Sequence, residues 1–367
     1  MPSSQSRLSS VVERPAVPPL WLGGAAACLT ALGLVVGVLD RAPTSSANSP
    51  AASAPPVSSS APVSVATTAV VSAPVLVAGA SIPPLADLIA RVGGPRVEVV
   101  SVVPQGVDGH TYEPTPSDVQ DLARADIKFF ASVDLNPAVT RTAEANLPPD
   151  AVRVDLMAAT MGGDEVIGAQ GHSHGSGGSH SHSNVHTWTD PTIASRWVTE
   201  IASQLTAIDP AGATEYSANA AGLLTQLQAL HDAIVAATAT IPEPNRTLVV
   251  YHDSWSYFGR TYGYQVLGAL QAADFAEPSA AEMRDMIDQV RASGAPAFFG
   301  AAVFPTEVLE RVSEEAGVPY FSNLADDELP GEPGEARHGY VGMMVENVRN
   351  IVTSLGGDPS SLDGVAL

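Results

Sequence analysis

Short apolar segments alternate with amphipathic ones in the first half of the chain. Residues 75–81, 96–104 and 127–133 are short and largely apolar, which is typical of buried strands. Between them, residues 82–94 have apolar positions at helical spacing and end on glycine, and residues 117–125 follow the same spacing after a serine cap. Strands that alternate with helices in this way predict a parallel α/β layer.

A long helical pattern separates this layer from a second one. It covers residues 193–240 and is broken near Asp209 and Pro210. The alanine-rich stretch 211–240 predicts one helix of about 45 Å. From residue 246 onward, strands and helices alternate again. The predicted fold class is therefore α/β, with two (β/α) lobes that have parallel sheets and are joined by one long α-helix. Ligands are expected in the cleft between the lobes.

The composition changes abruptly near the N-terminus. Residues 20–39 carry no charge and match the hydrocarbon thickness of a bilayer, and the stretch after residue 40 is almost wholly Ala, Ser, Pro, Thr and Val. The predicted parts of the chain are an N-terminal export signal or membrane anchor (1–40), a disordered linker (41–74), an N-terminal lobe (75–208) with a histidine-rich loop (170–184), a bridging helix (209–241) and a C-terminal lobe (242–367).

The charges around the apolar run predict the location of the rest of the chain. Arg7 and Arg14 precede the run and Asp40 follows it, so the positive-inside bias places later residues outside the cytoplasm. A cleaved signal and an uncleaved anchor both fit. Cys28 ends a weak lipoprotein-like box, but lipidation is not expected because most of the apolar run follows it. The predicted protein is extracytoplasmic, either tethered to the cell surface or secreted or periplasmic.

The net charge and the cysteine content limit which ligands the protein can bind and which residues can hold a metal. The net charge is −22, with 39 acidic and 17 basic residues, which argues against nucleic-acid binding. The chain has one cysteine, so an intrachain disulfide and a cysteine-based zinc site are excluded. A transition metal would have to be held by histidine and carboxylate.

The nine histidines fall into distinct settings. His110 and His252 follow strand-like runs, and His186 lies next to an ordered-looking Trp-Thr-Asp-Pro segment. These are positions where a cleft ligand belongs, and imidazole is the commonest side-chain metal ligand. His231, within the long helical stretch, is interpreted as structural. Four histidines form a tract among glycines and serines: His172, His174, His180 and His182.

A fourth metal ligand has several candidates near the C-terminus. His338 lies in a glycine- and glutamate-rich loop before a terminal helix. Asp326, Asp327 and Glu335 lie nearby and are rival oxygen ligands.

Four segments, in order along residues 75–355, resemble a known family. They are VDGHTYEPTPSDVQDLARADI, NVHTWTDP, VVYHDSWSYFGRTYGY and EARHGYVGMMVENV. They resemble the ligand motifs of metal-specific solute-binding proteins of ABC importers for zinc and manganese. The resemblance implies a metal site in the interlobe cleft, with His110, His186, His252 and His338 as ligands. The family usually has aspartate where His338 aligns, so a carboxylate or water is an alternative there.

The resemblance also implies a role and partners. The protein would capture Zn²⁺ outside the cytoplasm and deliver it, as a monomer, to an ABC permease and its ATPase. It would not be an enzyme. Three or four imidazoles suit zinc, whereas manganese prefers oxygen ligands and is therefore less expected. By raw affinity, copper would compete.

The histidine tract precedes His186, where zinc-type members of the family carry a histidine-rich loop. We expect it to be a weak, auxiliary metal collector, although an incidental low-complexity insertion is the alternative. Two other functions remain open: a cell-surface zinc buffer or adhesin without a transporter, and, remotely, a zinc hydrolase. No HExxH motif supports the latter.

Overall fold

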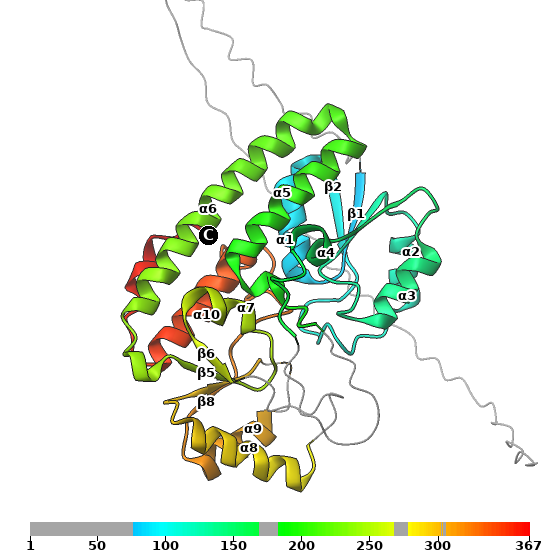
Figure 1. Ribbon diagram of the computed structural model, residues 1–367. Helices are drawn as coiled ribbons and strands as arrows, with labels where there is room; N and C mark the ends of the chain where they lie inside the picture. The colour runs from blue at the N-terminus through cyan, green and yellow to red at the C-terminus, as the bar shows by residue number, and fades with distance from the viewer. Residues whose placement is uncertain (1–75, 169–182, 268–277, 302, 304–305) are drawn as a thin grey trace, which may run out of the picture. The chain divides into compact units, whose positions relative to one another are not determined.

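The computed structural model describes residues 76–168, 183–267, 278–301, 303 and 306–367 (Figure 1). These residues belong to one compact unit. The predicted N-terminal signal or anchor, the linker and the four histidines of the tract lie outside the described residues. Among the residues that the structure describes, no helix has the length and apolar character needed to span a bilayer.

The first lobe contains a four-stranded parallel sheet in the order β2-β1-β3-β4. Ala78 of β1 pairs with Val99 of β2 on one side and with Ile127 of β3 on the other. The strand bounds are β1 Leu76–Ala80, β2 Val97–Ser101, β3 Ile127–Phe130 and β4 Val152–Asp155. All four residues of β3 are buried, as expected for an inner strand of a sheet covered on both faces.

The helices of this lobe begin at local start signals. Asn136 caps one of them through its side chain, and Thr115 and Asp118 form a capping box at another. Proline occupies the first turn of three of the four, where its missing N–H costs no hydrogen bond. The four helices are α1 Pro83–Gly93, α2 Pro116–Leu122, α3 Pro137–Asn146 and α4 Leu156–Thr160.

The second lobe repeats the topology of the first. Its parallel sheet has the order β6-β5-β7-β8, so each lobe places its first strand beside its second and third. The strands are β5 Thr247–Val250, β6 Gln265–Leu267, β7 Phe298–Phe299 and β8 Tyr320–Phe321, and the helices are α7 Ser256–Tyr262, α8 Ala280–Ser293, α9 Thr306–Ala316 and α10 Tyr340–Ser354.

Two long helices pack against each other, and the second of them connects the lobes. Helix α5 (Pro191–Ile208) ends at Asp209, which accepts hydrogen bonds from Arg96 and Tyr216. Helix α6 (Ala213–Ala239) has 27 residues, a length of about 40 Å. Figure 1 shows α6 alongside α5 at one end and α10 at the other, and both pairs are in contact. The predicted α/β class, the two parallel sheets and the long helix are thus confirmed.

The two lobes share one hydrophobic core. Its buried side chains include Leu88 of α1, Leu230 of α6 and Met344 of α10. A polar contact reinforces this junction, because Asp87 of α1 accepts a hydrogen bond from the backbone N–H of Tyr340, at the start of α10, at 2.8 Å. A smaller cluster lies beneath α8 and α9. Since apolar surface is buried continuously across the junction, the lobes are not independent bodies joined by a free hinge.

The first lobe also buries the only lysine of the chain, Lys128 of β3. Its side chain lies against Gly79, where a Cβ would come within 2.8 Å of the lysine Cδ. Its ammonium nitrogen has no hydrogen-bond partner among the described residues. Burial lowers the pKa of Lys128 from 10.5 to about 7, and the charge of Asp118 offsets only part of this effect.

This lysine should destabilise the fold in a pH-dependent manner. The unfolded chain holds the proton up to about pH 10.5 and the folded chain releases it near pH 7, so the penalty is complete below pH 7 and fades as the pH rises. We expect Lys128→Met to increase the free energy of unfolding at both pH 6 and pH 9. The increase should be smaller at pH 9, by about 2–3 kcal/mol. Urea unfolding at both pH values measures this. Arg153→Met, at the exposed position paired with Lys128, is the control. An equal gain at both pH values would contradict a buried ammonium.

Candidate metal centre

Three of the predicted ligands come together. His110, His186 and His252 each offer a ring nitrogen, and these atoms all lie within 4.8 Å of one another. The Nε2 atoms of His110 and His186 are 2.9 Å apart. The ring of His252 stands edge-on to both, with centroid separations of 4.8 and 4.6 Å. The first two histidines belong to the N-terminal lobe and the third to the C-terminal lobe.

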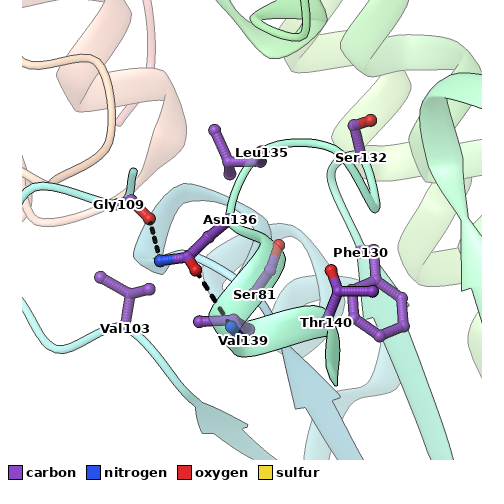
Figure 2. A pocket seen from close by; sticks show the side chains of 9 residues that line it. All are labelled: Ser81, Val103, Gly109, Phe130, Ser132, Leu135, Asn136, Val139 and Thr140. Carbon is purple, nitrogen blue, oxygen red and sulfur yellow. Dashed lines mark hydrogen bonds between the residues drawn. The ribbon is translucent and has the colours of Figure 1, made fainter. Parts of the chain in front are cut away.

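The His110 loop, which follows β2, is held by Asn136 at the start of α3. The Asn136 amide nitrogen donates to the carbonyls of Gly109 and Tyr112, at 2.8 and 2.9 Å, on either side of His110. Its amide oxygen accepts from the backbone N–H of Val139 (Figure 2). Figure 2 shows this amide within a small pocket of the first lobe. Because both ends of the amide are engaged, the loop is fixed relative to α3.

The second lobe also contacts this loop. The backbone N–H of Gly109 donates to Asp327 Oδ2 at 3.0 Å, and a Cβ at Gly109 would come within 2.6 Å of that oxygen. Glycine is therefore needed for the close approach. Asp108, His110 and Asp327 form a second group whose ligand atoms lie within 4.8 Å of one another.

His252 and the aspartates lie at the carboxyl ends of strands of the second sheet. His252 comes two residues after β5, and Asp326 and Asp327 follow β8. Asp326 Oδ2 is 3.6 Å from Nδ1 of His252. The backbone carbonyl of Asp326 accepts a hydrogen bond from the Trp188 indole at 2.7 Å, which links it to the His186 segment. Parallel strands bring these residues to one edge of the sheet.

The surroundings of His110 and His186 favour the neutral form of both rings. Burial, together with the charge of His252, lowers the pKa of His110 to about 3. Burial also lowers the pKa of His186 well below its usual value, with further contributions from His252 and His110. Protonation of either ring inside the site is thus unfavourable. Neutral imidazoles are the form that binds metal.

The pKa values of the two aspartates shift in opposite directions. Burial alone would raise the pKa of Asp326, but its contacts with His252, Ser254 and the Asp327 backbone hold that pKa below 3.8. Burial, and then the charges of Asp326 and Asp108, raise the pKa of Asp327 well above 3.8. Asp327 Oδ1 is buried and has no hydrogen-bond partner among the described residues. Burial and the neighbouring carboxylates thus favour the protonated form of Asp327 when no cation is bound.

The other histidine and carboxylate candidates lie elsewhere. Nδ1 of His338 lies 3.2 and 3.1 Å from the backbone carbonyls of Pro330 and Gly331, and His338 is not in either ligand group. Glu335 is exposed and forms an ion pair with Arg337. His231 lies on α6 with its Nδ1 3.0 Å from the Tyr262 hydroxyl, which agrees with a structural role.

Sequence reasoning missed two asparagines of this site, Asn136 and Asn184. Asn184 lies 3.0 Å from the His186 ring, and Asn136 holds the His110 loop. A signal for Asn136 existed, because it precedes Pro137 as a helix cap. The signal for Asn184 was its position two residues before a candidate ligand.

Comparison with known proteins shows which family the chain belongs to. The family model described as "Zinc-uptake complex component A periplasmic" (ZnuA) matches residues 79–354. The manganese-binding lipoprotein MntA of Halalkalibacterium halodurans is 29% identical over 271 residues, which cover 74% of this chain and 85% of MntA. The manganese ABC transporter substrate-binding lipoprotein PsaA of Streptococcus pneumoniae is 26% identical, with 74% and 86% covered.

A solved structure shows the same fold. The periplasmic zinc-binding protein TroA of Treponema pallidum superposes with a TM-score of 0.68 at 23% identity, and the match covers 76% of this chain and 99% of TroA. The family model spans more than half of the sequence and includes all three converging histidines. The chain therefore belongs to the ZnuA family of metal-binding solute-binding proteins of ABC importers.

Proposed function

We propose that this protein captures Zn²⁺ outside the cytoplasm, between its two lobes, and delivers it to an ABC permease driven by an ATPase. The main support is the contact between the Nε2 atoms of His110 and His186 at 2.9 Å. The His110 ring also donates to the backbone of Leu135, and the other nitrogen of His186 faces Asn184. With Nδ1 as the donor in both rings, two nitrogen lone pairs face each other. A bound cation relieves this repulsion.

Asp327 is our proposed fourth ligand, in place of His338. Its Oδ1 is buried without a hydrogen-bond partner among the described residues, and its carboxylate reaches the group that contains His110. His338 instead faces the carbonyls of its own loop. Asp326 then has a different role, because its contact with His252 Nδ1 orients that ring, as carboxylates do behind metal-bound histidines.

The ligand set favours zinc over manganese. Three imidazoles and one carboxylate fit tetrahedral Zn²⁺, whereas Mn²⁺ prefers sites richer in oxygen. A manganese importer is the second candidate, since MntA and PsaA are named for manganese and two buried aspartates adjoin the histidines. An iron-named relative, MtsA of Streptococcus pyogenes, matches as well.

A competitive titration decides between these candidates. The full-length chain is titrated with Zn²⁺ and, separately, with Mn²⁺ against a chelator of known affinity. We expect one tight Zn²⁺ site, additional weaker Zn²⁺ binding, and a Mn²⁺ affinity lower by several orders of magnitude. Tighter binding of Mn²⁺ would reassign the cargo. Weak, multiple binding of both metals would remove the interlobe site.

We also propose that the histidine-rich loop is an auxiliary collector that the tight site does not need. Gly168 and Ser183 form an antiparallel bridge, and the backbone N–H of Asn184 donates to the carbonyl of Ile167 at 2.8 Å. These contacts join the residues on either side of the histidine-rich loop, so the chain there does not depend on the loop itself.

The corresponding prediction concerns deletion of residues 169–182. Replacing them with a short glycine linker should abolish the weaker Zn²⁺ binding and change the affinity of the tight site by less than about threefold, well below the 10–100-fold typical of losing a residue that supports a ligand. Isothermal titration measures both. A matched replacement of the tract histidines by serine, at full loop length, separates the loss of imidazoles from the shortening. Loss of the tight site in either variant would contradict an auxiliary role.

A further inference from the structure

Every polar group of Asn184 is engaged, although its side chain lies in the interior and is only 3% exposed. The amide nitrogen donates to the carbonyl of Asp253 at 2.8 Å. The amide oxygen accepts from the backbone N–H of His186 at 3.0 Å and faces Nδ1 of the same residue at 3.0 Å. Its backbone carbonyl accepts a hydrogen bond from the Tyr257 hydroxyl.

These contacts fix which way the amide points. A backbone carbonyl can only accept and a backbone N–H can only donate, so the Asp253 carbonyl requires the amide nitrogen and the His186 N–H requires the amide oxygen. The oxygen is therefore the atom that faces the His186 ring. Since that oxygen can only accept, Nδ1 of His186 must carry the proton, and Nε2 presents its lone pair toward His110.

The same side chain joins the two halves of the metal centre. Asp253 is the residue after the ligand His252, so the amide bonds the segment of one ligand to the segment of another. A second bond runs parallel to it, from the Thr189 hydroxyl to the carbonyl of Ser254 at 2.9 Å. Removal of the amide would thus leave this junction partly intact, while the His186 ring would lose the acceptor 3.0 Å from its Nδ1 and retain only its contact with the Asp253 backbone.

We propose that Asn184 is a positioning residue that keeps His186 in the Nδ1–H tautomer and thereby keeps the centre open to a cation. Without Asn184, His186 adopts the Nε2–H tautomer and donates to Nε2 of His110, 2.9 Å away. The two imidazoles then satisfy each other and the coordinating lone pair is lost. This role rests on the proposed capture of a divalent metal by the three histidines.

The test compares Asn184→Ala with Asn184→Asp in the full-length chain. Nitrogen-15 NMR of the histidine rings in the metal-free protein reports the tautomer of His186, which is assigned with His186→Gln. We expect the Nδ1–H form in the wild type and in Asn184→Asp, whose carboxylate still accepts the proton, and the Nε2–H form in Asn184→Ala. Retention of the Nδ1–H form in the alanine variant would overturn the proposal.

Zinc affinity provides the second measurement. We expect Asn184→Ala to weaken Zn²⁺ binding by about 10–100-fold, as is usual for the partner of a metal-bound histidine, and Asn184→Asp to restore most of it. Asn245→Ala is the matched control, because Asn245 also links distant segments by donating to a carbonyl, that of Leu355, at 3.0 Å. That variant should lower thermal stability without changing zinc affinity. An equal loss of zinc affinity in both Asn184 variants would overturn the proposed control of the His186 tautomer. It would indicate that Asn184 acts through its hydrogen bond to the Asp253 carbonyl instead.

The two measurements separate this inference from the proposed function. If the wild type binds no divalent metal, the proposed function fails, while the tautomers of the metal-free variants still decide the role of Asn184. If the wild type binds zinc tightly and the alanine variant does so equally well, the function stands and the role of Asn184 is rejected.

Discussion

Replacing His252 with alanine is expected to weaken Zn²⁺ binding by more than about 100-fold, the upper end of the effect of losing an outer partner of a ligand. His252 is the only histidine of the cluster from the second lobe, and its ring faces both His110 and His186 at centroid distances below 5 Å. Without it, the second lobe contributes no imidazole to the cluster. Competition with a chelator of known affinity measures the change.

His231→Ala is the control for this variant. His231 is a partly buried histidine on α6 whose ring contacts the Tyr262 hydroxyl, away from the cluster. We expect it to bind Zn²⁺ with wild-type affinity. An unchanged affinity of His252→Ala would show that the tight site does not use the three-histidine cluster, and a manganese or histidine-tract site would have to be considered instead.

Replacing Asp327 with asparagine should weaken Zn²⁺ binding by about 100- to 1000-fold, since one pair of unit charges about 4 Å apart is worth about 4 kcal/mol at an effective dielectric constant of 20. The amide keeps the shape of the side chain and an acceptor for Gly109. It removes only the charge that balances the cation. In the metal-free protein, burial and the charge of Asp326 oppose ionisation of Asp327, so removing this acid group should raise the unfolding temperature at neutral pH.

His338→Ala is the paired variant, because His338 was the ligand that the sequence favoured. Its ring contacts the carbonyls of Pro330 and Gly331, so we expect less than about a threefold change in zinc affinity, below the usual effect of losing an outer partner. The reverse pattern, with a large loss in His338→Ala and none in Asp327→Asn, would restore His338 as the fourth ligand. It would also require the loop from Asp326 to His338 to rearrange on metal binding.

Opposite effects of Asp327→Asn on stability and on zinc affinity would show that the ligands are held together at a cost to the stability of the metal-free protein. A capture protein must hold ligands together in the absence of its cargo, and this one does so with facing imidazoles and adjacent buried carboxylates. Each is unfavourable without a cation. The shared core and the Asp87 contact to α10 stabilise the fold around them. We therefore expect metal loading to act on the loops of the site rather than on a wide hinge.

Much of the fold could be predicted because it is encoded locally. The apolar run around β1, the helical spacing of α1 and the long alanine-rich stretch of α6 each match the observed element closely. Local periodicity decides such elements. The weaker ones were not predicted: β4 has only one buried residue in four, and β6 has an exposed first residue. Their pairing in the sheets, rather than their composition, makes them strands.

That His110, His186 and His252 belong to one site could be inferred from the sequence, through the strand-like runs before two of them and the resemblance of the surrounding segments to a known family's motifs. In the structure the three rings lie together. The preference for Asp327 over His338, the contacts of Asn184 and the burial of Lys128 came only from the folded chain. The physical reason is that these side chains are oriented by partners far away in the chain. Asp327 accepts a hydrogen bond from Gly109, and Asn184 donates one to Asp253. The side chain of Lys128 packs against Gly79, where there is no Cβ. No local pattern encodes such contacts.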